Sequence, residues 1–255
     1  QIRQEEASGR FVVSKGLDEN KDQSYALWGV SQQSLSRTLF PLGELRKSEI
    51  YDEARRRGFT ALVNKPESYE ICFIPDNDYR GFLRRRVPGL DERVAGGRFV
   101  LADGTEVGRH EGYPFYTIGQ RKGLGIALGF PAYVTAIRPD TNEVVLGNYD
   151  ELASSFTTLH KLNMGKLASL EGRGLVPAVV KVRYHHPGTP ALLEQDGPDG
   201  IRIHFTEPVH AITPGQAAVF YDGADVLGGG WITRHVIGDG PAAVAAGPAA
   251  QVAAQ

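Results

Sequence analysis

Residues 217–232 read AAVFYDGADVLGGGWI, two apolar runs that are joined by Asp222-Gly223. An Asp-Gly pair between apolar runs is a strong local signal of a β-hairpin, because both residues tolerate the backbone of a tight turn. Shorter apolar runs precede this hairpin at residues 176–184, 191–194 and 201–205. Several short strands separated by turn residues are typical of a closed barrel. The sequence therefore predicts a compact β-barrel over residues 156–238.

Two more hairpins are expected upstream of the barrel. Residues 99–109 have Asp103-Gly104 near their centre, and residues 133–147 have the turn-forming run Pro139-Asp140-Thr141-Asn142 near theirs. Both turns are flanked by short apolar runs, as the strands of a hairpin are. They predict a small central β domain over residues 81–155.

Helical periodicity is found early in the chain. Residues 48–57 repeat apolar side chains at helical spacing, with Ser48 expected as the cap and Gly58 just past the end. A shorter helix is expected from Asp22 to about Trp28, ahead of Gly29. These signals predict an α/β opening to the chain.

Apolar runs at residues 38–40 and 71–74 each stop at a proline, and they predict an extended segment and a buried strand or turn. The end of the chain, residues 239–255, is rich in Ala, Gly and Pro without an apolar period, so we expect a disordered or extended tail. The chain as a whole is predicted to be α+β.

The composition is that of an ordinary folded protein, with 41% hydrophobic and 23% charged residues among 255. A net charge of −2 points to no particular partner. Cys72 is the only cysteine, which excludes an internal disulfide or four-cysteine metal site and favours a cytoplasmic setting. No stretch approaches 18 apolar residues, so no membrane segment is expected. The chain begins with Gln1 and its only methionine is Met164, so we expect that sequence is missing in front.

Cys72 is the first candidate for chemistry, because it is the only thiol. It lies between Glu70 and the apolar pair Phe73-Ile74 and is interpreted either as a small packed hydrophobe or as a nucleophile or sulfur carrier. Reactivity requires a lowered pKa of the thiol, which sequence does not reveal, so both interpretations stay open. Other His and carboxylate residues lack metal-ligand spacing, so no metal site is expected.

Two other patterns suit phosphate. Residues 119–125, GQRKGLG, combine three glycines with two cations but match neither the P-loop nor the Rossmann pattern, so they predict either a structural turn or a backbone contact to phosphate. In residues 179–186, strand alternation puts Lys181, Arg183 and His185 on one basic face. Alternate side chains of a strand lie about 7 Å apart, so this face is either merely solvated or spaced to contact successive phosphates.

Six stretches together resemble one protein family. They are DENKDQSY at 18–25, LFPLG at 39–43, EICFI at 70–74, YTIGQRKGLG at 116–125, VRY at 182–184 and TPGQ at 213–216. They run in the family's order from about residue 18 to about residue 232. The family is that of the tRNA-specific 2-thiouridylases, the MnmA/TrmU family.

The resemblance implies an enzyme that puts sulfur on carbon 2 of the wobble uridine in certain tRNAs, expected to be those for lysine, glutamate and glutamine. ATP activates the uridine oxygen in that family, and a cysteine persulfide, loaded by a sulfur carrier or cysteine desulfurase, delivers the sulfur. The implied architecture is a C-terminal remnant of an α/β PP-loop domain at residues 1–80, followed by the central β domain and the barrel.

One departure from the family bears on the cofactor. The family's SGGxDS PP-loop and its first cysteine do not occur in this sequence. The ATP site is therefore expected in a missing N-terminal portion, no cofactor is expected to bind to this chain, and the chain by itself is expected to be inactive.

By position, Cys72 matches the cysteine that carries the persulfide. The resemblance also implies tRNA contacts at Lys21, Asp22, Gln23, Arg183, Tyr184 and Gln216, with Lys181 as a further candidate for contact with phosphate. Two alternatives remain open. The first is a non-catalytic β module that binds structured RNA, in which Cys72 only packs, and the second is an unrelated β-barrel of the translation machinery.

Overall fold

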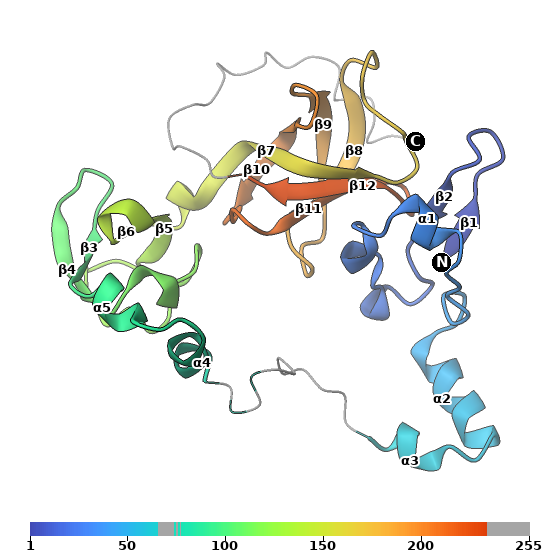
Figure 1. Ribbon diagram of the computed structural model, residues 1–255, viewed down its shortest axis with the longest axis horizontal. Helices are drawn as coiled ribbons and strands as arrows, with labels where there is room; N and C mark the ends of the chain where they lie inside the picture. The colour runs from blue at the N-terminus through green and yellow to red at the C-terminus, as the bar shows by residue number, and fades with distance from the viewer. Residues whose placement is uncertain (66–73, 75, 77, 234–255) are drawn as a thin grey trace. The chain divides into compact units, whose positions relative to one another are not determined.

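The computed structural model describes residues 1–65, 74, 76 and 78–233, with their elements labelled in Figure 1. Two compact units are present: one joins residues 1–63 to the described residues from 154 onward, and the other lies within residues 64–153. In the described part of the chain, no helix has the length and apolar character that a membrane span needs.

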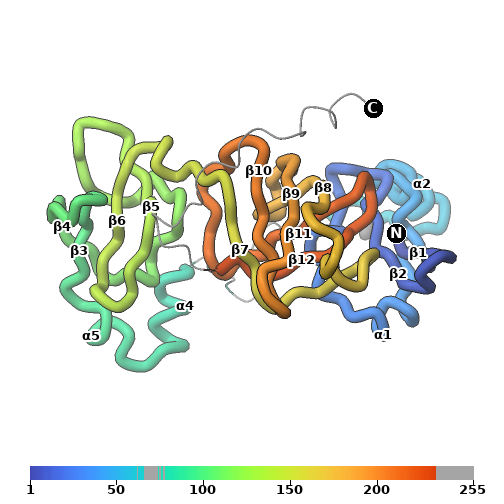
Figure 2. The backbone as a smooth tube through the Cα atoms, turned by 90° about the horizontal axis from the view of Figure 1, so that it is seen from above, coloured from blue at the N-terminus to red at the C-terminus, as the bar shows by residue number. Residues whose placement is uncertain are grey.

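The first unit is built on a closed six-stranded barrel, as the sequence predicts (Figures 1 and 2). Around the barrel the strand order is β10-β7-β12-β11-β8-β9. The strands are β7 (Ala153–Met164), β8 (Val176–Lys181), β9 (Thr189–Gln195), β10 (Ile201–His210), β11 (Ala217–Asp222) and β12 (Asp225–Ile232). Leu193, Ile201 and Ile203 fill its interior and have no exposed surface.

Strand β11 is buried on both of its faces. Ala218 and Phe220 belong to the apolar core inside the barrel, whereas Val219 and Tyr221 belong to a second apolar cluster. Residues from the first 35 positions, including Val13 and Leu35, complete that second cluster. The N-terminal segment is therefore an outer layer over the barrel rather than a separate body.

This outer layer consists of short elements. They are the antiparallel hairpin β1 (Ile2–Gln4) and β2 (Phe11–Val13), the 3₁₀ helices η1 (Glu19–Lys21) and η2 (Ser24–Leu27), and helix α1 (Gln32–Leu35). The expected helix at residues 22–28 is thus a 3₁₀ turn, and the expected extended segment at 38–40 is irregular.

Polar contacts fix the outer layer to the barrel. The Asp225 carboxylate accepts hydrogen bonds from Ser14 Oγ (2.7 Å) and Arg3 Nη2 (2.5 Å), and it lies 3.0 Å from Lys166 Nζ. Burial alone would raise the pKa of Asp225, but the bonds from Ser14 and Lys166 and the nearby Arg3 charge leave it below its usual value. Asp225 therefore stays ionised and ties the two layers together.

Gly229 in β12 permits the close contact between the layers. A Cβ on Gly229 would lie 3.0 Å from the Trp28 ring and 2.9 Å from the Ala218 carbonyl oxygen. Gly230 instead permits a contact within the barrel, because a Cβ there would lie 2.8 Å from Leu162 of β7. Real Cβ atoms do not approach other atoms so closely without a shift, so the absence of a side chain at Gly229 is what admits the Trp28 indole.

The second unit contains a four-stranded mixed sheet. Its strand order is β4-β3-β6-β5, with β3 and β6 parallel and the other pairs antiparallel. The elements are α4 (Tyr79–Arg86), α5 (Leu90–Val94), β3 (Gly97–Val100), β4 (Glu106–His110), η3 (Tyr113–Phe115), β5 (Tyr133–Arg138), η4 (Pro139–Thr141), β6 (Glu143–Gly147) and η5 (Asp150–Leu152). Both expected hairpins, β3-β4 and β5-β6, are confirmed.

The helix expected at residues 48–57 is α2 (Lys47–Arg56), followed by α3 (Thr60–Val63). Ser48 is not its cap, which is a correction of the prediction. The N-cap is Arg46, whose backbone N–H donates to the Glu49 carboxylate at 2.6 Å, so the acidic residue of the first turn satisfies the helix end.

Two further expectations need correction or stay open. The strand expected to run to Tyr184 ends at Lys181, and the long strand β7 was not expected. The expected strand or turn at 71–74 lies outside the described residues except for the buried Ile74, and so does the expected tail. The division into four segments stays a prediction.

We predict that Gly229→Ala lowers the free energy of unfolding by about 1–3 kcal/mol, because the new methyl group collides with the Trp28 ring and a backbone oxygen. Thermal and urea unfolding of the full chain would measure the change. Gly29→Ala is the matched control, since a Cβ there meets no atom within 4 Å. Equal stability of Gly229→Ala and the parent would contradict the close packing of the two layers.

Candidate nucleic-acid interface

The structure brings together two segments that the sequence separates by about 160 positions. The Gln23 Nε2 group donates a hydrogen bond to the Tyr184 hydroxyl at 2.5 Å. The same hydroxyl donates to the backbone carbonyl of Asp22 at 3.1 Å. The predicted contact residues near η2 and those that follow β8 therefore form one site.

Tyr25 connects this site to the start of β11. Its hydroxyl donates to the Ala217 carbonyl at 2.8 Å, and its ring meets Tyr184 edge to face at a centroid distance of 6.1 Å. Burial raises the pKa of Tyr25 to about 12, against the opposing charge of Arg183, so the hydroxyl keeps its proton and remains a donor. Gln216 is exposed and directly precedes Ala217, so the Tyr25 hydroxyl links the Tyr184 end of the site to the residue that follows Gln216.

The side chain of Asp22 is engaged within the chain. Its carboxylate accepts hydrogen bonds from the Ser24 hydroxyl at 2.7 Å, the Ser24 N–H at 3.1 Å and the Gly16 N–H at 3.0 Å. Three donors satisfy a carboxylate without any ligand. Asp22 therefore shapes the turn that carries Lys21 and Gln23.

Arg183 is the exposed cation of the site. It lies in the turn that follows β8, where its Nη1 donates to the His210 carbonyl at 3.1 Å. In the part of the chain that the structure describes, no carboxylate pairs with Arg183. A guanidinium has five N–H donors, so the side chain is anchored and can still bind an anion.

The histidines after Arg183 differ in environment. His185 is exposed, and its ring lies edge to face against Tyr184 at 4.7 Å. His186 is buried, and its Nδ1 accepts a hydrogen bond from the Gly188 N–H at 3.2 Å. Burial and the charges of Arg183 and Lys181 lower the pKa of His186, so it is a neutral structural residue. The described residues also contain no cluster of metal-ligating side chains.

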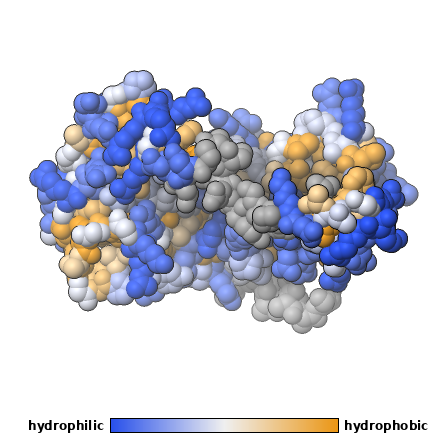
Figure 3. Space-filling model, turned by 90° about the horizontal axis from the view of Figure 1, so that it is seen from below, coloured by the Kyte–Doolittle hydropathy of each residue, from blue (hydrophilic) through white to orange (hydrophobic). Residues whose placement is uncertain are grey.

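Sequence reasoning did not consider Trp231, an exposed aromatic residue on the neighbouring strand β12. It is 42% exposed, meets Trp28 edge to face at 5.6 Å, and lies opposite Ala217 in the β11-β12 register. Figure 3 shows that exposed hydrophobic side chains also gather elsewhere, so exposure alone does not single out Trp231. Its pairing with Ala217 places it at the end of β11 that Gln216 precedes.

The glycine-rich run of residues 119–125 lies in the other unit and is a closed turn. Gly119, Gly123 and Gly125 have positive φ angles of 83°, 73° and 69°. The Gln120 side chain fills the loop, because its Oε1 accepts from the Thr117 N–H at 3.1 Å and its Nε2 donates to the Lys122 carbonyl at 3.0 Å. The loop interior therefore offers no cradle for the phosphates of a nucleotide.

Cys72 and its neighbours at residues 67–73 lie outside the described residues. The candidate thiol therefore stays a prediction from the sequence, as do the contact roles of Lys21, Asp22, Gln23, Lys181, Arg183, Tyr184 and Gln216.

Family models match three consecutive parts of the chain. The model described as tRNA methyl transferase HUP domain matches residues 1–76, and the one described as tRNA methyl transferase PRC-barrel domain matches residues 81–148. The model described as aminomethyltransferase beta-barrel domain matches residues 160–232.

Curated relatives are similar over most of this chain. A tRNA-specific 2-thiouridylase MnmA of Amoebophilus asiaticus is 67% identical over 225 residues, which is 88% of this chain and 59% of the relative. The proteins of the same name from Cytophaga hutchinsonii and Salinibacter ruber are 62% and 51% identical, over 91% and 93% of this chain and 62% and 61% of their own lengths. The chain thus spans about three fifths of the relatives it matches, and with these identities and the three matched domains it belongs to the MnmA family of tRNA-specific 2-thiouridylases.

Proposed function

We propose that this chain is the tRNA-holding and sulfur-accepting part of an enzyme, a tRNA-uridine 2-sulfurtransferase acting on the wobble uridine. The proposal rests on the two hydrogen bonds that link Gln23 and the Asp22 carbonyl to the Tyr184 hydroxyl. These hydrogen bonds bring together two segments that the family resemblance assigns separately to contact with the same RNA. An unrelated barrel would not be expected to join them. Such an enzyme would act in the cytoplasm, as the single cysteine also suggests.

The side chains of the site suit RNA. Arg183 and Lys21 can neutralise phosphates, which positions an RNA without reading its sequence. Gln216 can hydrogen-bond a base edge or a ribose hydroxyl, and the exposed Trp231 ring offers a face for stacking. A structured RNA such as tRNA presents all of these groups together.

ATP would supply the activation of the uridine oxygen in this reaction. The glycine-rich loop at residues 119–125 does not suit the phosphates of ATP, because the Gln120 side chain occupies it. The match of residues 1–76 to a HUP domain supports the assignment of this segment to the end of a nucleotide-using domain. We assign no residue of this chain to the nucleotide.

Cys72 is proposed as the sulfur acceptor. Its thiolate would take sulfane sulfur from a donor persulfide, leaving the donor as a thiolate and forming a new S–S bond at Cys72. Donors proposed here are a persulfide carrier or a cysteine desulfurase. The alternative, a non-catalytic module that binds structured RNA, differs in that Cys72 only packs.

We predict that Arg183→Ala weakens tRNA binding and flattens the dependence of log affinity on log salt by about 0.7–0.9, the value for one phosphate contact. Gln216→Ala should lower affinity with a nearly unchanged slope, because a neutral amide releases no counterion. Filter binding of the full chain to tRNA at several salt concentrations measures both. If Arg183→Ala keeps the parent's affinity and slope, this surface does not hold tRNA.

Tyr184→Phe should lower tRNA affinity about 2- to 10-fold at an unchanged salt slope, because it removes two hydrogen bonds but no charge. Tyr79→Phe removes an exposed hydroxyl bonded to a backbone carbonyl in the other unit and is the matched control. If both variants bind tRNA with the same affinity, the hydrogen bonds of the Tyr184 hydroxyl do not order the contact residues.

Cys72 should gain a mass of one sulfur after exposure to a persulfide-loaded cysteine desulfurase. The adduct should disappear with reductant and be absent in Cys72→Ser, as mass spectrometry of the digested chain would report. A native thiol that resists both the donor and an alkylating agent would favour the RNA-binding module without chemistry.

A further inference from the structure

Three segments of the second unit converge at one end of the β5-β6 hairpin. Tyr133, the first residue of β5, lies opposite Gly147, the last residue of β6. The glycine-rich loop joins the same end, because the Gly119 N–H donates to the Val134 carbonyl at 2.8 Å and the Val134 N–H donates to the Gln120 carbonyl at 2.9 Å. Residues from the three segments therefore share one surface.

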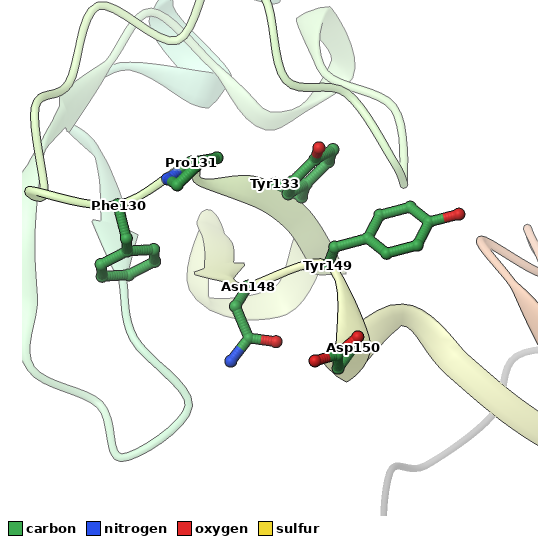
Figure 4. Close-up of a pocket in the computed structure, with 6 residues that line it drawn as sticks. All are labelled: Phe130, Pro131, Tyr133, Asn148, Tyr149 and Asp150. Carbon is green, nitrogen blue, oxygen red and sulfur yellow. The ribbon is translucent and has the colours of Figure 1, made fainter.

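That surface contains an open pocket of about 450 Å³ (Figure 4). It is lined by Phe130, Pro131, Tyr133, Asn148, Tyr149 and Asp150. The rings of Tyr133 and Tyr149 lie 5.4 Å apart at 60°, and Phe130 and Tyr149 are 43% and 51% exposed. Rings with this much exposed surface can contribute to a stacking contact with a ligand.

The pocket is held in shape by its own loop. The Glu151 carboxylate accepts from the Asn148 N–H at 2.9 Å, and the Asn148 Oδ1 accepts from the Glu151 N–H at 3.1 Å. Gly147 makes room for this exchange, since a Cβ there would lie 2.6 Å from the Glu151 carboxylate. The Asn148 Nδ2 group donates to no described residue, and it is available as a donor inside the pocket.

Two consecutive cations lie on the glycine-rich loop, and the first of them lies beside an aromatic ring of the pocket. Arg121 is exposed, with its guanidinium 5.9 Å from the Tyr133 ring centroid, and Lys122 follows it on the same loop. Within the described residues neither side chain has an ion-pair partner, whereas most arginines of this unit do: Arg80, Arg84, Arg85, Arg98, Arg109 and Arg138. The loop therefore carries two uncompensated positive charges next to the pocket.

We propose that this pocket binds one unpaired nucleobase of an RNA, with the adjacent phosphates on Arg121 and Lys122. Base stacking on aromatic rings beside cations is the usual arrangement for single-stranded nucleic acid, because every base has a π-face and every nucleotide a phosphate. Asn148 Nδ2 and the Asp150 carboxylate can meet the donors and acceptors of a base edge. The proposal deepens the proposed function by assigning this unit a share of the same RNA.

The test compares binding of tRNA to the full chain and to pocket variants. Tyr149→Ala should weaken binding about 5- to 100-fold, the loss expected for one stacked base, while Tyr149→Phe should retain most of it. Arg121→Ala should flatten the salt slope by about 0.7–0.9. Tyr79→Ala, an exposed tyrosine of the same unit outside the pocket, should bind like the parent.

Equal tRNA affinity of the parent and Tyr149→Ala overturns the pocket proposal and leaves the barrel site standing, because Arg183→Ala reports on that site alone. If the parent fails to bind tRNA, the proposed function fails, and a single-stranded hexaribonucleotide then decides the pocket. Binding of that oligonucleotide by the parent but not by Tyr149→Ala supports the proposal. If the parent does not bind the oligonucleotide, or if Tyr149→Ala binds it as tightly as the parent, the proposal is overturned.

Discussion

The burial of β11 on both faces is the constraint on which the first unit depends. A barrel strand has one face toward the interior, and here the other face is also removed from water by the first 35 residues. That second contact requires β12 to lack a side chain at Gly229, so that Trp28 can lie against the backbone. The outer layer in turn presents Gln23 to Tyr184. The geometry of the proposed RNA site, which includes exposed hydrogen bonds, thus depends on an apolar interface several residues away.

The energies of these two kinds of contact differ in size. Each exposed hydrogen bond of the site contributes about 0.5–1.5 kcal/mol, whereas fully burying one large apolar side chain contributes about 1.5–3 kcal/mol. Val13, Leu35, Val219 and Tyr221 are all nearly or fully buried in the outer cluster. The apolar layer therefore provides the stability, and the hydrogen bonds at Tyr184 provide the geometry. A substitution of a polar residue at the site is therefore expected to alter its geometry more than the stability of the first unit.

Strands bounded by turn residues of distinctive chemistry could be predicted from the sequence. Strands without such turn residues could not. The β5-β6 hairpin has the expected bounds because Pro139-Asp140-Thr141-Asn142 leaves little choice of turn, and Asn142 adopts a left-handed φ of 52°. Strand β7, ASSFTTLHKLNM, is largely polar, and a bulge interrupts it where Lys161 has a φ of 50°. Neither alternation nor apolar content therefore predicts this strand from the sequence. The early end of β8 was missed because residues 182–186 contain no glycine or proline. The contact between Gln23 and Tyr184 could not be predicted, because it depends on which surface the outer layer covers.

The two proposed RNA sites use different chemistry, and this difference bears on how an RNA would be held. The barrel site is mainly polar and charged, whereas the pocket at Tyr133 and Tyr149 is aromatic and bordered by cations. Contacts to phosphate position an RNA of any sequence, while stacking requires a base that is not paired. An RNA that engages both sites gains the second contact at an effective concentration set by the connecting chain, so two modest affinities multiply. Duplex RNA without an unpaired base can use only the first. Discrimination of a folded RNA from a plain duplex would then come from the second unit, without any reading of base sequence by the barrel.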